Sequence, residues 1–244
     1  MFWRRMLVSE AVSEWVLAGF AQLIRDMGPA RFLYETRLIL PTKAYFKTGK
    51  GQDHDTALAV FDEVRLHMGL SKRPCELVRR AGRLEAAAYD YNQFSAVAGT
   101  FQHDGNSAVI TYDPDLLLRP VCFISTMAHE LAHYVLDGQR LEGWHGAEAE
   151  AEHELMTDLC AIAHGFGVIQ MQAARKAGWA GYLSNETRAY ATALFCHLKG
   201  IAPGEVEPHL DGYLRKRFRL ASRQLAQQAE DLRVLEDIVD GVDI

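Results

Sequence analysis

Two histidines and a glutamate at fixed spacing are the residues of this sequence best suited to chemistry. Residues 129–133 read His-Glu-Leu-Ala-His, which is the H-E-x-x-H pattern. On a helix, positions i and i+4 project from one face, so His129 and His133 can bind one metal ion together. Glu130 lies about 100° further around the helix, where it can reach a water on that ion without binding the ion itself. We therefore expect His129 and His133 to bind zinc and Glu130 to act as a general base.

A catalytic zinc site of this kind needs a third protein ligand and an open fourth position. Four acids on the next expected helix are within reach: Glu148, Glu150, Glu152 and Glu154. We expect Glu154 to be the ligand, because Asp158 follows it at i+4 on the same helix stripe, where the helix becomes apolar. A buried carboxylate needs a partner, and a ligand histidine needs one for its second ring nitrogen. We therefore expect Asp158 to orient a ligand histidine, namely His129. The helix dipole, which favours acids near a helix N-terminus, explains the first three acids better than it explains Glu154.

This arrangement, H-E-x-x-H followed 21 residues later by E-x-x-x-D, resembles the gluzincin zinc metallopeptidases. Thermolysin-like, HtpX-like and ImmA/IrrE-like proteins share it. The resemblance covers residues 96–164 and implies the ligand set, the base and the orienting acid given above, with one zinc ion per chain. It also implies that a strand before the active helix, 96–101 or 108–112, lines the cleft. An exposed edge strand can bind an extended peptide or protein substrate through main-chain hydrogen bonds.

Hydrolysis of a peptide bond also uses a donor that stabilises the developing oxyanion. Five downstream side chains are candidates, and the sequence does not choose among them: Tyr182, Tyr190, His164, His197 and His209. For a lone tyrosine or histidine on a helix, a packed or hydrogen-bonded structural role is the commoner one. His153 adjoins Glu154 but points about 100° away from it, so we expect His153 to be solvated or to cap the helix.

Periodicity and breakers predict the elements that must position these groups. Helices are expected at 9–27, 55–67, 120–137, 147–164, 185–199, 206–218 and 219–238, and strands at 75–78, 94–101 and 108–112. The turn residues 102–107 predict an antiparallel hairpin of the last two strands. The link 138–146 is long enough for antiparallel packing of an active-site helix pair. The expected class is α+β, mainly helical, with a zincin-like core and a small mixed sheet.

Composition and charge exclude several other classes. The 244 residues are 49% apolar and 24% charged, and 26 basic against 32 acidic residues give a net charge of −6. The chain therefore has no strongly basic field to recruit nucleic acid. No apolar run reaches the ~20 residues that an integral membrane segment needs. The four cysteines are widely spaced without a C-x-x-C pair, which indicates free thiols in a cytoplasmic protein.

We expect an N-terminal helical region over residues 1–70 and a zincin-like metallopeptidase domain with C-terminal helices over residues 71–244. The leading interpretation is a zinc metallopeptidase that acts on a peptide or protein. One alternative is a regulatory, ImmA/IrrE-like protein that binds a specific protein partner and cleaves it rarely. The other is a non-enzymatic binding module stabilised by zinc. Such a structural site needs a fourth protein ligand and has no use for a general base at Glu130. The oligomeric state stays open.

Overall fold

The computed structural model of the chain describes residues 6–48, 51–80, 99–103, 107–137, 147–177 and 181–241. These residues are mainly helical with a small mixed three-stranded sheet, which confirms the α+β class. The chain divides into two compact units. The first comprises Met1–Ile39, Leu159–Gln172 and Leu183–Ile244, and the second comprises Leu40–Asp158 and Ala173–Tyr182. The domain boundary expected near residue 70 and the zincin-like core stay predictions.

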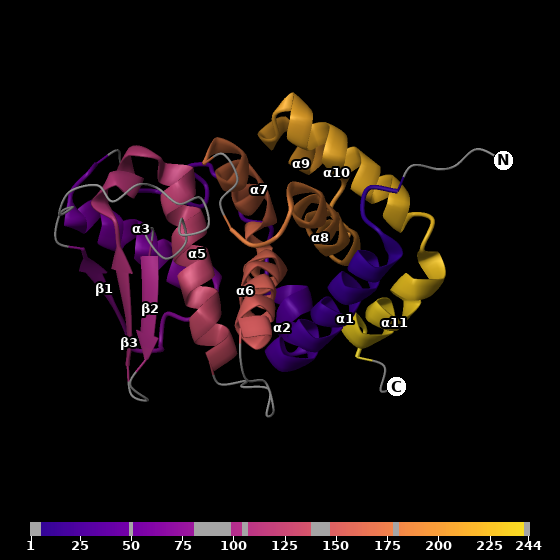
Figure 1. Cartoon of the computed structure of the whole chain (residues 1–244), viewed down its shortest axis with the longest axis horizontal. Coiled ribbons are helices and arrows are strands. Elements are labelled where there is room, and N and C mark those ends of the chain that lie inside the picture. The colour runs from indigo at the N-terminus through magenta and orange to yellow at the C-terminus, as the bar shows by residue number, and fades with distance from the viewer. Residues whose placement is uncertain are drawn as a thin grey trace. The chain divides into compact units, whose positions relative to one another are not determined.

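The sheet belongs to the second unit and has the strand order β1 (Cys75–Arg79), β3 (Ala108–Tyr112), β2 (Gly99–His103) (Figure 1). Strand β2 pairs antiparallel with β3, with Gly99 opposite Tyr112, and β1 pairs parallel with β3. The expected hairpin and the mixed sheet are therefore confirmed. Residues 94–98 of the expected strand 94–101 lie outside the described residues.

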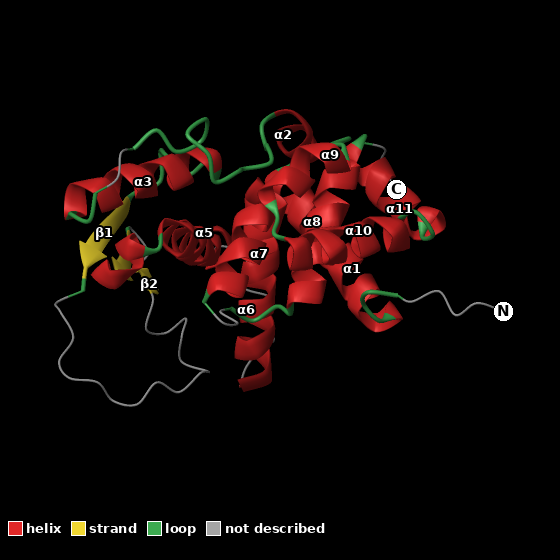
Figure 2. Cartoon of the chain, turned by 90° about the horizontal axis from the view of Figure 1, so that it is seen from above, coloured by secondary structure: helices red, strands yellow, loops and turns green. Residues whose placement is uncertain are grey.

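Three helices complete the second unit's framework: α3 (His54–His67), α5 (Pro120–Leu136) and most of α6 (Ala147–Ala161). The Asp53 side chain caps α3 by accepting a 2.8 Å hydrogen bond from the Thr56 N–H. Pro120 starts α5, where its missing N–H costs nothing, directly after the 3₁₀ turn η2 (Pro114–Leu118). Helix α5 packs against both α3 and β2, so its buried faces are shared between a helix and the sheet (Figure 2).

The first unit is helical. It contains α1 (Glu10–Met27), α2 (Pro29–Tyr34), α8 (Asn185–Leu198), α9 (Pro203–Val206), the 3₁₀ turn η5 (Glu207–His209), α10 (Gly212–Leu225) and α11 (Ala229–Val239). Helix α7 (Gly167–Lys176), which the periodicity did not delimit, spans the boundary of the units. Helix α1 contacts α2, α8 and α11, and α8 contacts α10. Among the described residues, no helix is both long enough and apolar enough to cross a bilayer. All four cysteines are free thiols.

The expected helices 206–218 and 219–238 are wrong in where they break. Helix α10 begins directly after Asp211, whose side chain accepts a 2.8 Å hydrogen bond from the Leu214 N–H. The helix then continues through position 218, because Phe218, Ala221 and Leu225 form one buried stripe. The cap at Asp211 and the continuous buried stripe therefore keep 212–225 in one helix. The helical break lies after Leu225, in the segment between α10 and α11.

Helix α6 also ends earlier than the expected 147–164. A π-helical turn, η4 (Ile162–Phe166), follows it, and Gly165 adopts φ 94°. A Cβ at this position would collide with the Arg37 carbonyl oxygen, so the turn requires glycine. The His164 ring lies inside this turn, with its Nδ1 2.9 Å from the Cys160 carbonyl oxygen. Burial lowers the pKa of His164 to about 4.

This buried imidazole should make stability depend on pH. The unfolded chain binds a proton at the ordinary histidine pKa of 6.5, whereas the folded ring does so only near 4, so stability falls as the pH drops through this range. In His164→Asn, an amide can still donate to the Cys160 carbonyl but does not titrate. Between pH 7.5 and pH 5, we expect the unfolding free energy of the parent to fall by about 2 kcal/mol more than that of His164→Asn. Urea denaturation at both pH values measures this difference, and equal pH dependence would contradict it.

Candidate metal centre

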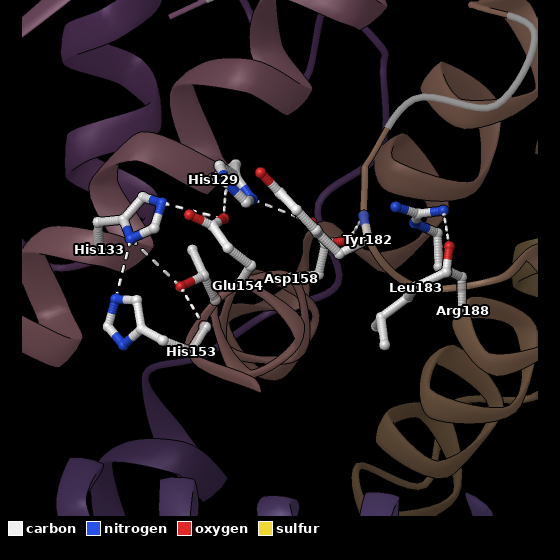
Figure 3. A network of polar contacts seen from close by, with 9 residues as sticks. His129, His133, His153, Glu154, Asp158, Tyr182, Leu183 and Arg188 are labelled. Carbon is white, nitrogen blue, oxygen red and sulfur yellow. Dashed lines mark hydrogen bonds and ion pairs between the residues drawn. The ribbon is translucent and has the colours of Figure 1, made fainter. Parts of the chain in front are cut away.

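Three predicted ligand residues come together between α5 and α6, within the second unit. The Nε2 atoms of His129 and His133 lie 3.2 Å and 3.5 Å from Oε2 of Glu154. The three donor atoms all lie within 4.8 Å of one another, a spacing at which they could hold one metal ion. Figure 3 shows both imidazoles projecting from α5 toward the Glu154 carboxylate. The i, i+4 spacing therefore places both histidines on one face of α5, as the sequence predicted, and α6 supplies the carboxylate.

The Glu154 carboxylate has an oxygen that the protein itself leaves without a hydrogen bond. Its Oε2 atom is buried, and although both imidazole Nε2 atoms lie within ion-pair distance, no described residue donates to it in hydrogen-bond geometry. A buried carboxylate oxygen in this condition is costly unless a cation stands beside it. Two imidazole nitrogens and one carboxylate oxygen form a donor set that suits zinc. The chemistry of these three residues therefore fits a bound divalent ion.

The charges of the cluster favour a cation at the same place. Burial alone would lower the pKa of His129, yet Asp158 and Glu154 raise it to about 10. Burial alone would raise the pKa of Glu154, but the two imidazoles outweigh this effect and lower the pKa to about 2. The raised pKa means that the two carboxylates favour a proton, and so a positive charge, on the His129 ring. A metal ion binds a neutral imidazole and would take the place of this proton.

Asp158 contacts His129 in the way the sequence predicted. Its Oδ1 atom lies 3.0 Å from His129 Nδ1, and its Oδ2 atom accepts a 2.9 Å hydrogen bond from the Tyr182 N–H. The side chain is only 2% exposed. Because Asp158 engages Nδ1, the other ring nitrogen of His129 is directed toward Glu154 (Figure 3).

Glu130 is a buried acid beside this cluster. Its side chain is 4% exposed, although it follows His129 directly on α5. Burial raises the pKa of Glu130, and the imidazoles of His129 and His133 only partly oppose this effect. A carboxylate with a raised pKa is a stronger proton acceptor once ionised. The Glu130 carboxyl is thus electrostatically coupled to the ligand group without belonging to it.

The structure adds two residues that the sequence interpretation did not assign to the site. His153 is exposed, as expected for a solvated residue, but its Nε2 also lies 3.1 Å from His133 Nδ1. The buried Thr157 Oγ1 lies 3.3 Å from the same atom and donates to the His153 carbonyl at 2.8 Å. Through these contacts the Nδ1 atom of His133 has polar partners, as the Nδ1 atom of His129 has one in Asp158. The usable signal was that His133 also needs a partner for Nδ1, and that Thr157 precedes Asp158 on the same helix.

The imidazole rings of His133 and His153 approach each other through their nitrogen atoms. The ring centroids of His133 and His153 lie 5.2 Å apart with an interplanar angle of 27°. This separation suits two nearly coplanar rings joined by an N–H···N bond and is too long for close face-to-face packing. Partial burial, followed by the neighbouring imidazoles, lowers the pKa of His153. A lowered pKa favours the neutral ring, which can accept a hydrogen bond from His133 Nδ1.

Of the five candidate oxyanion donors, Tyr182 is the one whose ring contacts a ligand residue. It lies parallel to the His129 ring, with centroids 6.0 Å apart and an interplanar angle of 14°, and it is 41% exposed. The other four belong to the first unit, and three of their side chains have partners there. Tyr190 donates to Gln228, His197 pairs with Glu236, and His164 contacts the Cys160 carbonyl.

Comparison of this chain with models of protein families, with curated proteins and with solved structures found no match. The interpretation of the site therefore rests on its own residues and geometry.

Replacing the acid of the ligand group tests whether Glu154 binds the ion. We expect Glu154→Ala to weaken zinc binding at least about 100-fold, because loss of a ligand should cost more than loss of an outer contact. Competition against a chromophoric chelator measures the affinity. Glu150→Ala is the matched control, since Glu150 is exposed on the same helix. If Glu150→Ala weakens binding and Glu154→Ala does not, the acid has been assigned wrongly.

Removing both acceptors of His133 Nδ1 should weaken metal binding without removing a ligand. For the double variant His153→Ala/Thr157→Val we expect a loss of zinc affinity of about 10- to 100-fold. His153→Gln should retain most of the affinity, because an amide oxygen can accept the same hydrogen bond. His197→Ala, which removes an exposed histidine that pairs with Glu236, is the control. Parent-like affinity of a folded double variant would show that these contacts do not orient His133.

Proposed function

We propose that this protein is a zinc-dependent peptidase. The observation that carries the proposal is the convergence of two imidazole nitrogens on a buried carboxylate oxygen, with all three donor atoms within 4.8 Å of one another. Beside them lies a buried acid, Glu130, that belongs to the same helix as the histidines. A metal that only stabilises a fold needs no such acid, whereas a hydrolytic centre uses one to move a proton. The pairing of the two features therefore favours catalysis.

The proposed chemistry divides between the ion and the protein. A bound zinc ion would polarise the scissile carbonyl and lower the pKa of its water toward ~7. Glu130 takes the proton of the attacking water and later passes it to the leaving amine. Asp158 holds the His129 ring so that Nε2 faces Glu154, where the ion would bind, and the contacts of His153 and Thr157 with Nδ1 would orient His133 in the same way.

The position of strand β2 supports a peptide as substrate. Among the described strands, β2 is at an edge of the sheet, because it pairs with β3 alone. It also packs against α5, and the Phe101 ring lies parallel to the His133 ring with centroids 6.1 Å apart. An extended peptide that adds to this edge would run beside the ligand group. Main-chain hydrogen bonds would then supply affinity for peptides of varied sequence.

Tyr182 is the oxyanion donor that we favour. Its contact with the His129 ring and its partial exposure support this choice. A phenolic hydroxyl can donate to an oxygen on which negative charge develops.

Replacing the proposed base should separate catalysis from metal binding. We expect Glu130→Gln to keep about one zinc ion per chain and to lower peptide hydrolysis by about 10²- to 10⁴-fold, the usual contribution of a general base. Metal analysis of the purified protein and digestion of a peptide library measure the two properties.

Glu35→Gln is the control for this change, because Glu35 is an exposed glutamate of the first unit. Hydrolysis by Glu130→Gln at the parent rate would refute the proposed mechanism. A parent that binds zinc but cleaves no peptide would instead indicate a non-enzymatic zinc module. Cleavage of only a few library members would indicate a regulatory peptidase with a narrow choice of partner.

A further inference from the structure

We infer that Gly99 and Thr126 are positioning residues that confine the Glu130 carboxylate. The inference rests on the proposed function, in which Glu130 is the base. The missing side chain at Gly99, the first residue of β2, and the methyl group of Thr126 on α5 together limit where the carboxylate can lie.

The backbone of β2 approaches Glu130 so closely that no side chain fits between them. A Cβ built on Gly99 would lie 2.9 Å from Glu130 Oε1 and 3.1 Å from Glu130 Cγ. It would also lie 3.0 Å from Thr126 Cγ2, one helical turn before Glu130. The Gly99 backbone therefore bounds the carboxylate on one side, and the Thr126 methyl group borders the same small space in front of Gly99. Glu130 is 4% exposed, so the protein surrounds most of its side chain.

The strand is held against α5 on the same face that carries Gly99. Residues i and i+2 of a strand point to one side, and Phe101 packs against the rings of His133 and Tyr134, with centroids 6.1 Å and 5.7 Å away. Across the hairpin, the partner of Gly99 is Tyr112, which is fully buried and meets the Phe123 ring edge-on at 5.4 Å. Both contacts tie the sheet to α5, so β2 cannot withdraw without breaking them.

An added methyl group at position 99 must therefore be accommodated by the side chains it meets. The Glu130 carboxylate is the far end of a flexible side chain, and rotating it costs less than moving two packed elements. Gly99→Ala should consequently displace the base while leaving the fold and the ligand group intact. A misplacement of about 1 Å can lower a catalysed rate by about 10²-fold.

The experiment compares Gly99→Ala, Thr126→Ser and the double variant with the zinc-loaded parent. For Gly99→Ala we expect kcat to fall about 10- to 100-fold, with KM and zinc affinity changed less than about threefold. Thr126→Ser removes the Cγ2 atom that the new methyl group would meet, so the double variant should recover several-fold of the lost kcat. Gly212→Ala is the matched control, because a Cβ there has no neighbour within 4 Å.

A second measurement does not depend on activity. In protein labelled with ¹³C at glutamate side chains, the carboxyl resonance of Glu130, identified by its absence in Glu130→Gln, should shift in Gly99→Ala. It should return toward the parent position in the double variant. Unchanged resonance and kcat in Gly99→Ala would overturn the inference, as would a Gly99→Ala protein that does not fold, since the strand would then have yielded. Absence of hydrolysis in the parent would refute the proposed function, whereas the resonance would still test the confinement.

Discussion

A buried carboxylate, Asp158, is the constraint on which the arrangement of the His129, His133 and Glu154 group depends. With 2% of its side chain exposed, its charge must be satisfied inside the protein, and His129 Nδ1 and the Tyr182 N–H do so. Asp158 lies one helical turn after Glu154, so the bond from Asp158 to one nitrogen of His129 turns the other toward Glu154. One contact between α5 and α6 thereby places two members of the ligand group.

The same contact explains why two carboxylates can share a small buried space. The His129 ring lies between them with one nitrogen facing each carboxylate, which raises the pKa of His129 to about 10, and the two imidazoles lower the pKa of Glu154 to about 2. The site is built around a positive charge, which a divalent ion can replace. His133 has a different environment, because its second nitrogen faces the His153 imidazole and the Thr157 hydroxyl instead of a carboxylate. The two histidines of the group therefore have different partners.

Much of the fold was predictable because the signals are local. The helix from Glu10 begins after Ser9, whose hydroxyl accepts from the Val12 N–H, and the strand 108–112 alternates buried and half-buried residues. Two boundaries were not predictable in this way. The π turn at Gly165 depends on the closeness of the Arg37 carbonyl oxygen, and a contact so distant in sequence leaves no periodic trace. The break between α10 and α11 depended on which residues the first unit buries.

For the site, the sequence by itself determined the spacing of His129 and His133 on one helix face and that of Glu154 and Asp158 on another. Helical periodicity alone produces both pairs. Tertiary structure decided which faces meet, and with them the contacts made by His153, Tyr182 and the backbone of Gly99. These contacts join segments far apart in the chain, and their distances depend on how side chains fill space, which no repeat in the sequence encodes.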